Sequence, residues 1–450
     1  METYRPEYHF SPTAGWLNDP NGLIWHEGEY HLFYQWYPTV DVDIAGMCWG
    51  HAVAGDLVHW THLDVALRPD ALGAIWSGSA VVDRADTSGL FGGKGGLVAA
   101  FTHRSASDAQ RQGVAYSDDR GRTWMKYAGN PVLGDDASRE FRDPKVFWHQ
   151  PTRRWVMVVG VEHQVFASPN LRDWTLLGKT GFSSECPDLF PLPVEGEAEV
   201  LWVLSLAGRQ VVVGAFDGRT FTPQTGPIEV DGGPDFYAAQ SWENVPGGRR
   251  IWIGWLNNWR YARQVPDFGA RGFLSVPREL SLRRVAGRGL VLVQRPVPEL
   301  QVSRTGCERI DPRDIRPGRP LAAGDALEIR ATIRPGANDR CGFKVAVGED
   351  QETLVGYDAA ADRAFVDRER SGLAVTRGRF DAQVALRNGL VDMQIFVDRC
   401  STEAFFGDGE AVISTQIYPA GPGRAVEWFS ENGRSGVEEM RVDRVEAGKQ

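Results

Sequence analysis

The chain has few cysteines, no long apolar run and no excess of basic residues, and each lack excludes a class of protein. Its five cysteines are odd in number and widely spaced, which argues against a disulfide framework. No segment approaches the ~18 consecutive apolar residues of a membrane-spanning helix. The net charge of −10 disfavours a nucleic acid or an anionic membrane as a partner. We therefore expect free thiols, no membrane and no nucleic acid.

Sequence patterns that bind metals or cofactors are also missing. The nine histidines form no metal-like spacing, and no Cys/His pattern for zinc is present. The chain lacks a phosphate-binding loop, the glycines of a dinucleotide fold and a Gly-X-Ser-X-Gly elbow. We expect no metal and no cofactor.

The first ten residues, Met-Glu-Thr-Tyr-Arg-Pro-Glu-Tyr-His-Phe, contain neither a basic start nor an apolar segment. They therefore do not read as a secretory signal. This favours a cytoplasmic protein, although a secreted protein whose signal has been removed would look the same.

The length and the tryptophan distribution indicate more than one domain. A chain of 450 residues is long enough for two or three domains. Fifteen of the sixteen tryptophans lie before residue 260, and only Trp428 lies after it. The Arg-Pro-Val-Pro stretch at 295–298 reads as a linker. We predict a first domain over 1–290, a linker over 291–302 and a second domain over 303–450.

A tight turn followed by an aromatic residue recurs four times in the first part. The copies lie at 56–60, 119–124, 170–174 and 217–221, and their aromatic residues are 64, 50 and 47 positions apart. A short strand-like run precedes each copy. Repeats of ~40–50 residues built from short strands are typical of a β-propeller. Five units of this kind can be traced, so the sequence predicts five blades.

The second part also reads as β-structure. Apolar and polar residues alternate over 326–333 and 390–397, and Asn-Gly and Asp-Gly turns occur at 388–389 and 408–409. About 150 residues of this pattern fit a β-sandwich. The predicted fold is all-β: a five-bladed β-propeller followed by a C-terminal β-sandwich.

Three acidic residues occupy matching places in three of the propeller units. Asp19 lies in Trp-Leu-Asn-Asp-Pro-Asn-Gly (16–22), Asp143 in Phe-Arg-Asp-Pro (141–144) and Glu185 in Ser-Glu-Cys-Pro-Asp (184–188). Each stands just before a strand-like run that begins a blade. Taken singly, they could be a turn residue, a salt-bridge partner and a strand-end acid. Because the first strand of each blade lines the central channel, we expect the three acids to surround one end of it.

Convergent carboxyl groups suit the cleavage of a sugar–sugar bond. A retaining glycosidase needs a nucleophile and an acid/base ~5–5.5 Å apart. Asp19 can stay ionised beside hydrogen-bond donors such as Asn18. Glu185, next to Cys186 and near two other acids, can hold the proton that the leaving group needs.

The third acid has a different expected task. Asp143 follows Arg142, and this pairing is expected to keep the Asp143 carboxylate ionised. It could then hold sugar hydroxyls and stabilise positive charge that develops on the ring.

Further side chains near the predicted channel end could complete a sugar pocket. The aromatic candidates are Trp16, Trp49, Trp76, Phe91 and Trp255. For most of the tryptophans, packing between blades is the commoner role. Gln35, Ser77 and Gln240 could hydrogen-bond to sugar hydroxyls.

Taken together, the motifs resemble one known family, glycoside hydrolase family 32, the β-fructofuranosidases. The matching stretches are 16–22, Tyr-His-Leu-Phe-Tyr-Gln (30–35), Trp-Gly-His (49–51), Asp-Leu-Val-His-Trp (56–60), Trp-Ser-Gly-Ser (76–79), 141–144, Glu-Cys (185–186), Asp-Phe-Tyr (235–237) and Asp-Arg-Cys-Ser-Thr-Glu-Ala-Phe-Phe (398–406). They cover almost the whole chain.

The resemblance implies a retaining mechanism without a metal. By similarity, Asp19 is the nucleophile, Glu185 the acid/base and Asp143 the transition-state stabiliser. Tyr237, in the Asp-Phe-Tyr motif, joins the expected binding residues. The expected activity is release of terminal β-D-fructofuranosyl residues from fructans, fructooligosaccharides or sucrose.

Within the family, the stretches 254–262, 271–272 and 276–280 look most like exo-acting levanases and inulinases, with Trp255 lining the fructose subsite. Such enzymes commonly carry a second Trp-Gly shortly before the Trp-Gly-His motif. Here the corresponding stretch, Asp-Val-Asp-Ile-Ala-Gly (41–46), contains no aromatic residue. We expect one wall of the pocket to differ.

Three other functions remain open from the sequence. A fructosyltransferase would use the same covalent intermediate. The Asp-box-like turn at 117–124 also fits a sialidase, and a non-catalytic sugar-binding propeller is the third alternative. The sequence leaves open whether the second domain joins two copies in a homodimer or adds a substrate subsite.

Overall fold

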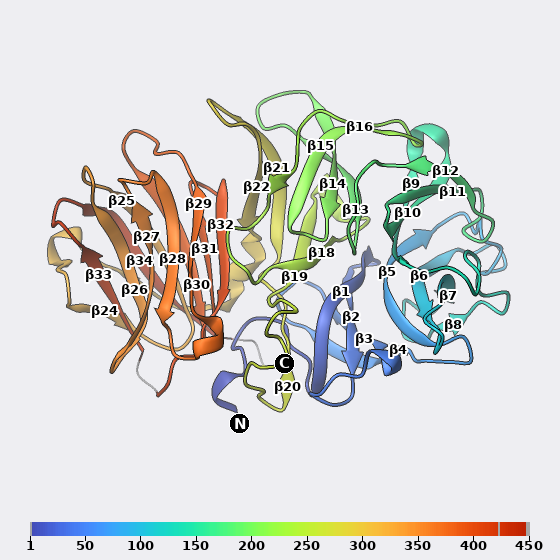
Figure 1. The fold of residues 1–450 in the computed structure, drawn as a ribbon, viewed down its shortest axis with the longest axis horizontal. Helices are drawn as coiled ribbons and strands as arrows, with labels where there is room; N and C mark the ends of the chain where they lie inside the picture. Colours follow the sequence, from blue (N-terminus) through green and yellow to red (C-terminus); the bar gives the residue numbers. More distant parts are fainter. Residues whose placement is uncertain (1, 422–423, 447–450) are drawn as a thin grey trace.

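The computed structural model describes residues 2–421 and 424–446, and almost every regular element in them is a β-strand (Figure 1). Five sheets form a propeller, and two more form a sandwich beside it. This confirms the predicted all-β fold. The helical segments are short 3-10 turns: η1 (Glu2–Tyr4), η2 (Ile44–Gly46), η3 (Gln150–Thr152), η4 (Pro246–Gly248), η5 (Pro298–Ser303), η6 (Pro312–Asp314) and η7 (Ala374–Thr376). Among the described residues no helix is long and apolar enough to cross a membrane.

Each blade is built on four antiparallel strands that lie side by side in chain order. Blade one has β1 (Gly15–His26), β2 (Glu29–Tyr37), β3 (Cys48–Ala54) and β4 (Thr61–Leu67), and β20 (Ala270–Arg271) pairs along β1. Blade two has β5 (Ala74–Asp83), β6 (Gly96–Arg104), β7 (Gln110–Ser117) and β8 (Met125–Lys126). Blade three has β9 (Phe141–His149), β10 (Arg154–Val161), β11 (Gln164–Ser168) and β12 (Thr175–Lys179).

The remaining two blades complete the propeller. Blade four has β13 (Asp188–Pro193), β14 (Val200–Leu206), β15 (Gln210–Phe216) and β16 (Phe221–Pro223), with β17 (Ile228–Glu229) also on β15. Blade five has β18 (Tyr237–Ser241), β19 (Ile251–Trp255), β21 (Arg278–Val285) and β22 (Gly289–Pro296). The segment 291–302, which the composition assigned to a linker, contains most of β22 and then η5. The reason is that Val291, Leu292 and Val293 are buried and paired with β21.

The first strands of the five blades contact one another around the channel. Neighbouring blades are joined by the following pairs: Gly78 N to Asn21 Oδ1 (3.3 Å), Ser79 Oγ to Pro144 O (2.7 Å), Lys145 Nζ to Asp188 Oδ1 (3.1 Å), Ser241 N to Asp188 Oδ2 (2.7 Å) and Trp25 N to Glu243 O (3.0 Å). These contacts close the ring from blade one to blade five, so residues at the start of each first strand lie around the same end of the channel.

The repeated turn lies at the same place in blades one to four, between the third and fourth strands. In each copy the first residue folds its side chain back onto the turn. Asp56 accepts from the His59 amide at 2.8 Å, and Asp217 accepts from the Thr220 amide at 2.7 Å. The copies that begin at Asp119 and Asn170 make equivalent bonds. The repeat is therefore a structural turn of the blade, as expected for residues that hydrogen-bond to their own backbone.

The sandwich consists of two six-stranded sheets. One has the order β23 (Arg304–Arg309), β34 (Gly436–Val445), β25 (Leu327–Arg334), β30 (Val391–Asp398), β31 (Ser401–Phe406), β32 (Ala411–Gln416). The other has β24 (Pro320–Ala323), β33 (Ala425–Ser430), β26 (Arg340–Gly348), β27 (Gln351–Asp358), β28 (Arg363–Arg370), β29 (Arg379–Gln383). Alternate residues such as Ile329 and Ile395 from the first sheet meet Phe343 and Trp428 from the second in one buried cluster.

A buried ionic network joins the sandwich to the propeller. His9, before blade one, bonds to Asp398 (2.7 Å) and to Glu403 (2.8 Å), both on the sandwich. Arg278 of β21 bonds to the same Glu403 (2.5 Å) and to Asp231 (3.1 Å). Burial alone would lower the pKa of His9, but the bonds to Asp398 and Glu403 raise it to about 9. His9 is therefore charged at neutral pH and helps to balance the buried carboxylates.

We expect Arg278→Met to destabilise the protein strongly, because it leaves Asp231 and Glu403 buried with one cation fewer. Breaking a buried ion pair from one side costs about 3–5 kcal/mol. Urea unfolding followed by circular dichroism measures the change. Arg313→Met is the control: its pair with Asp311 is exposed, so its effect should be close to zero. Equal unfolding midpoints for the two variants would contradict this view of the network.

Candidate active site

A cavity of about 340 Å³ opens at the end of the channel where the three acids lie. Its volume is within the ~300–1,000 Å³ range of small-molecule sites. The lining residues come from several blades: Asn18, Asp19, Gln35, Ile44, Met47, Trp76, Ser77, Arg142, Asp143, Glu185, Trp259 and Arg263. The structure thus brings Asp19, Asp143 and Glu185 together, although they are far apart in the sequence.

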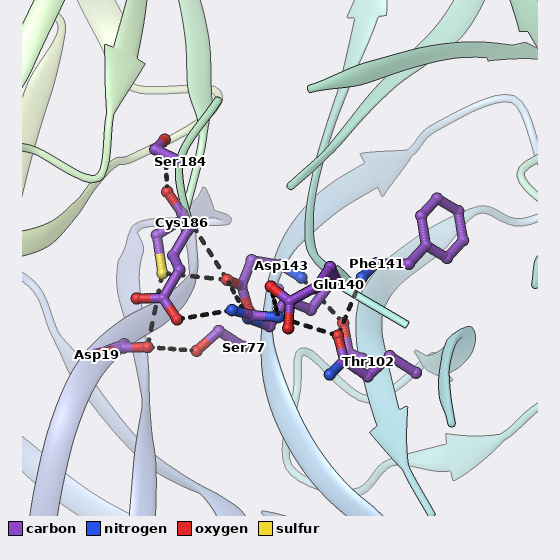
Figure 2. Close-up of polar contacts among 12 residues, drawn as sticks. Asp19, Ser77, Thr102, Glu140, Phe141, Asp143, Ser184 and Cys186 are labelled. Atoms are coloured by element: carbon purple, nitrogen blue, oxygen red, sulfur yellow. Dashed lines mark hydrogen bonds and ion pairs between the residues drawn. The ribbon is translucent and has the colours of Figure 1, made fainter. Parts of the chain in front are cut away.

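Asp19 reaches the cavity from an irregular stretch of β1. The register between β1 and β2 shifts at Asn18 and Asp19, so these residues leave the regular alternation of the strand. Asn18 Nδ2 donates to Asp19 Oδ1 at 2.9 Å. Ser77 Oγ donates to Asp19 Oδ2 at 2.7 Å (Figure 2). Trp16 Nε1 donates to Asn18 Oδ1 at 2.8 Å and fixes the orientation of that amide. Both Asp19 oxygens therefore have a donor.

Asp143 reaches the cavity from the start of β9. Its φ of 61° lies in the left-handed region, which Asp tolerates better than most residues. Its amide donates to Thr102 Oγ1 at 3.0 Å, and its Oδ2 accepts from the Cys186 amide at 3.0 Å (Figure 2). These two bonds fix the backbone and the carboxylate of Asp143 between blades two and four.

The Cys186 thiol lies between the two aspartates. Its Sγ is 3.6 Å from an oxygen of Asp19 and 3.6 Å from an oxygen of Asp143 (Figure 2). Burial raises the pKa of this thiol well above its usual value, and the nearby carboxylates raise it further. The group therefore stays protonated and can donate a weak hydrogen bond to either aspartate.

Glu185 is the most open of the three acids, with 38% of its side chain exposed. Arg142 Nη2 donates to Oε1 at 2.9 Å, and the Tyr237 hydroxyl donates to Oε2 at 2.7 Å. Arg142 is itself held by Glu140 and Gln110. The Glu185 carboxyl is thus fixed from two sides while it remains accessible from the cavity.

Burial and mutual repulsion set the protonation of the aspartates. Burial, followed by the charge of Asp19, raises the pKa of Asp143 to about 7. Burial also raises the pKa of Asp19, although the bonds from Asn18 and Ser77 oppose the shift. We expected Arg142 to keep Asp143 ionised, but its Nε is 3.9 Å from Asp143 Oδ2 and its short contact is to Glu185.

The other predicted binding residues divide into three groups. Asn18, Gln35, Trp76, Ser77 and Arg142 line the cavity. Trp49, Cys186, Tyr237 and Trp255 are behind this lining: Trp49 donates to the Trp76 carbonyl at 3.0 Å, and Trp255 is fully buried and packs on Trp16. Phe91 does not line the cavity. It packs at 5.8 Å from the Tyr116 ring in the core of blades two and three.

Four lining residues were not among the predicted site residues: Ile44, Met47, Trp259 and Arg263. Ile44 belongs to the 41–46 stretch without an aromatic residue, and its carbonyl accepts from Trp76 Nε1 at 3.0 Å. Ile44 therefore lines the cavity from the stretch where the sequence predicted a different wall. Trp259, 43% exposed, stacks on Trp16 at 5.9 Å and contacts Trp255 at 4.8 Å.

Within 2–421 and 424–446 no three His, Cys, Asp or Glu residues are placed to hold a metal ion. The polar side chains that line the cavity bond to one another, as Ser77 does to Asp19 and Arg142 does to Glu185.

The two domains of the chain match two domains of one known protein family. Residues 9–296 match the N-terminal domain of glycosyl hydrolases family 32, and residues 301–444 match the C-terminal domain of that family. The chain belongs to glycosyl hydrolase family 32. It is 43% identical to a levanase of Bacillus subtilis over 98% of this chain and 70% of the levanase.

Two solved structures of this family align with nearly the whole chain. The exo-inulinase of Aspergillus awamori superimposes with a TM-score of 0.88 at 31% identity, covering 99% of this chain and 98% of the inulinase. The β-fructofuranosidase of Schwanniomyces occidentalis, solved with fructosyl-erythritol, gives 0.88 at 29% identity, covering 99% and 98%. This family 32 enzyme is therefore a glycoside hydrolase with the family's fold.

The raised pKa of Asp143 predicts a dependence of stability on pH. A carboxyl whose pKa rises from 3.8 to about 7 on folding binds its proton more tightly in the folded state. The contribution of this carboxyl to the free energy of unfolding is therefore highest below pH 3.8 and falls as pH rises to about 7. Between pH 5 and pH 8 the loss from this group is at most about 3 kcal/mol.

Asp143→Asn should remove that loss, so the variant should gain stability relative to the wild type as pH rises from 5 to 8. Urea midpoints at both pH values measure this. Asp311→Asn is the control, since the pKa of exposed Asp311 is lowered to about 2 and its contribution is constant over this range. A stability difference between wild type and Asp143→Asn that is the same at both pH values would contradict the assignment.

Proposed function

We propose that this chain hydrolyses terminal β-D-fructofuranosyl residues from fructans, fructooligosaccharides or sucrose through a covalent fructosyl-enzyme intermediate. The observation that supports this most strongly is the convergence of three carboxyl groups on one cavity, two of them bridged by the Cys186 thiol and the third held by Arg142 and Tyr237. The levanase and the fructofuranosidases among its relatives support the choice of sugar.

Asp19 is the proposed nucleophile. A carboxylate that attacks the anomeric carbon must be ionised and correctly oriented. Asn18 and Ser77 donate to its two oxygens and favour the ionised form. Both donors line the cavity and come from different blades, so the carboxylate is held on opposite sides.

Glu185 is the proposed acid/base. It first gives a proton to the departing sugar oxygen and then takes one from the water that hydrolyses the intermediate. Its partial exposure suits both steps, because the leaving group and the water must reach it. Tyr237 and Arg142 hold the carboxyl in position, and the hydrogen bonds from them must relax when Glu185 carries its proton.

Asp143 is the proposed stabiliser of the transition state. It is nearly fully buried and is anchored by the Cys186 amide rather than by a mobile side chain. A fixed carboxylate in a poorly solvated site interacts strongly with positive charge that develops on the sugar ring. The pKa of about 7 implies that activity falls as the pH drops below 7, because Asp143 becomes protonated.

The alternative functions have less support. The 117–124 turn that suggested a sialidase lies between β7 and β8 in the outer part of blade two, where Asp119 accepts from Thr123 as a structural turn. A non-catalytic propeller does not require three convergent acids. Transfructosylation shares the intermediate, but the relatives named above are hydrolases by description.

The first test is product analysis after incubation with sucrose, inulin and levan. The wild type should release fructose, and Asp19→Ala should lose at least ~10³-fold in kcat because it lacks the nucleophile. Asp136→Ala, which changes an exposed carboxylate paired with Arg111, is the control and should behave as the wild type. A folded Asp19→Ala enzyme with near-normal kcat would contradict the proposal.

A second test separates acid catalysis from other roles of Glu185. Glu185→Ala should lose ~10²–10⁴-fold on sucrose but much less on an aryl fructoside with a good leaving group, because such a group departs without a proton. The comparison is made under single-turnover conditions, so that only the first step is measured. Equal losses on both substrates would mean that Glu185 is not the acid.

A further inference from the structure

Two parts of the cavity depend on one buried residue of blade five, Asp235. Tyr237, which holds Glu185, follows Asp235 by two residues at the start of β18. Trp259 and Arg263 line the cavity from the segment 256–268, which is hydrogen-bonded to Asp235. Asp235 itself is fully buried and does not line the cavity.

Asp235 is bonded to both sides of Trp259. Its Oδ1 accepts from Asn258 Nδ2 at 2.7 Å and from the Tyr261 hydroxyl at 2.5 Å. Asn258 immediately precedes Trp259, and Tyr261 lies two residues after it. The position of the Trp259 ring is therefore tied to the Asp235 carboxylate.

The other side of Asp235 is held by the sandwich. Arg368 of β28 donates to Asp235 Oδ2 at 2.8 Å through Nη1 and to the Tyr261 hydroxyl at 2.9 Å through Nη2. Only 1% of the Arg368 side chain is exposed. The backbone amide of Gln416, in β32, donates to Asp235 Oδ2 at 2.8 Å. The side-chain Nε2 of Gln416 donates to the Leu256 carbonyl at 2.7 Å.

The wall formed by Trp259 continues to the catalytic centre. Trp259 stacks on Trp16, whose indole fixes the Asn18 amide, and Asn18 in turn donates to Asp19. A shift of the 256–268 segment would therefore change the cavity wall and the support of Asp19. A shift of Asp235 would also move Tyr237 and so change the support of Glu185.

We propose that Arg368 of the sandwich is a positioning residue of the active site, acting through Asp235 on Tyr237 and on the wall that carries Trp259 and Arg263. Without Arg368, Asp235 would keep a buried negative charge with no cation beside it, and the segments around it would have to rearrange to reach water. The sandwich thus completes the catalytic site of the propeller. This inference rests on the proposed fructosidase function.

The test uses the full-length protein with Arg368→Met, Arg368→Lys and Tyr261→Phe. Arg368→Lys keeps a charge beside Asp235 but lacks the planar fork that reaches Asp235, the Gln416 carbonyl (2.7 Å) and the Tyr261 hydroxyl together. Tyr261→Phe removes only the shared hydroxyl. Arg283→Met is the matched control: Arg283 also joins the two domains, through Glu195, Asp408 and Glu410, but none of these lines the cavity.

Two readouts are compared for each variant. The first is kcat and KM on sucrose and on an aryl fructoside. The second, which needs no activity, is hydrogen–deuterium exchange of peptides that cover 235–241 and 256–268. Thermal unfolding of each variant gives the folded fraction.

Arg368→Met should lower kcat/KM by ~10- to 100-fold, with KM raised as well as kcat lowered, and should increase exchange in both peptides. A smaller folded fraction alone would lower kcat and leave KM unchanged. Arg368→Lys and Tyr261→Phe should be intermediate, and Arg283→Met should keep wild-type kinetics and wild-type exchange in these peptides.

Folded Arg368→Met with wild-type KM, kcat and exchange would overturn the inference. If Arg368→Met does not fold, wild-type KM, kcat and exchange in both Arg368→Lys and Tyr261→Phe would overturn the inference. If the wild type cleaves no fructoside, the proposed function fails, and the exchange comparison with Arg283→Met still decides whether Arg368 positions this wall.

Discussion

The carboxylates of partly buried Asp19 and buried Asp143 are held close together, each 3.6 Å from the thiol of Cys186. Two like charges with little water around them repel each other, and burial adds to the cost of ionising them. The pKa of Asp143 rises to about 7 for these reasons. Donors from Asn18, Ser77 and the Cys186 amide offset part of this cost. A transition state with positive charge on the sugar ring would relieve the same repulsion, so the two close carboxylates favour the chemistry proposed for this site.

The backbone around these groups departs from regular β-structure where each acid enters the site. The register of β1 shifts at Asp19, and Asp143 and Cys186 have φ values of 61° and 43°. Left-handed backbone costs roughly 1–2 kcal/mol for a residue other than glycine. Such conformations persist only where the surrounding structure fixes them. Here the five blades supply that support, and the sandwich adds Arg368 and Gln416 behind blade five.

The sequence predicted the elements of the site that depend on local patterns. Asp19, Asp143 and Glu185 could be placed together because each begins a blade and because blades repeat regularly. Phe91 was misplaced, since its position near a strand end did not show that Asp86 would bond to its amide and fold the loop back onto blade two. Arg368 could not be found at all: it lies 133 residues from Asp235 in another domain, and no local pattern marks an arginine that will be buried at an interface. Long-range packing decided both cases.

The most direct test of the proposed mechanism is to identify the residue that carries the sugar during turnover. The enzyme is mixed with a fructoside that has a fast leaving group, quenched in acid within the first turnover, digested and analysed by mass spectrometry. If Asp19 is the nucleophile, the peptide that contains Asp19 gains one fructosyl unit, and this label is lost when Asp19 is replaced by Ala. Attachment to a peptide containing Asp143 or Glu185, or rapid turnover with no labelled peptide, would contradict the assignment of Asp19 and with it the proposed mechanism.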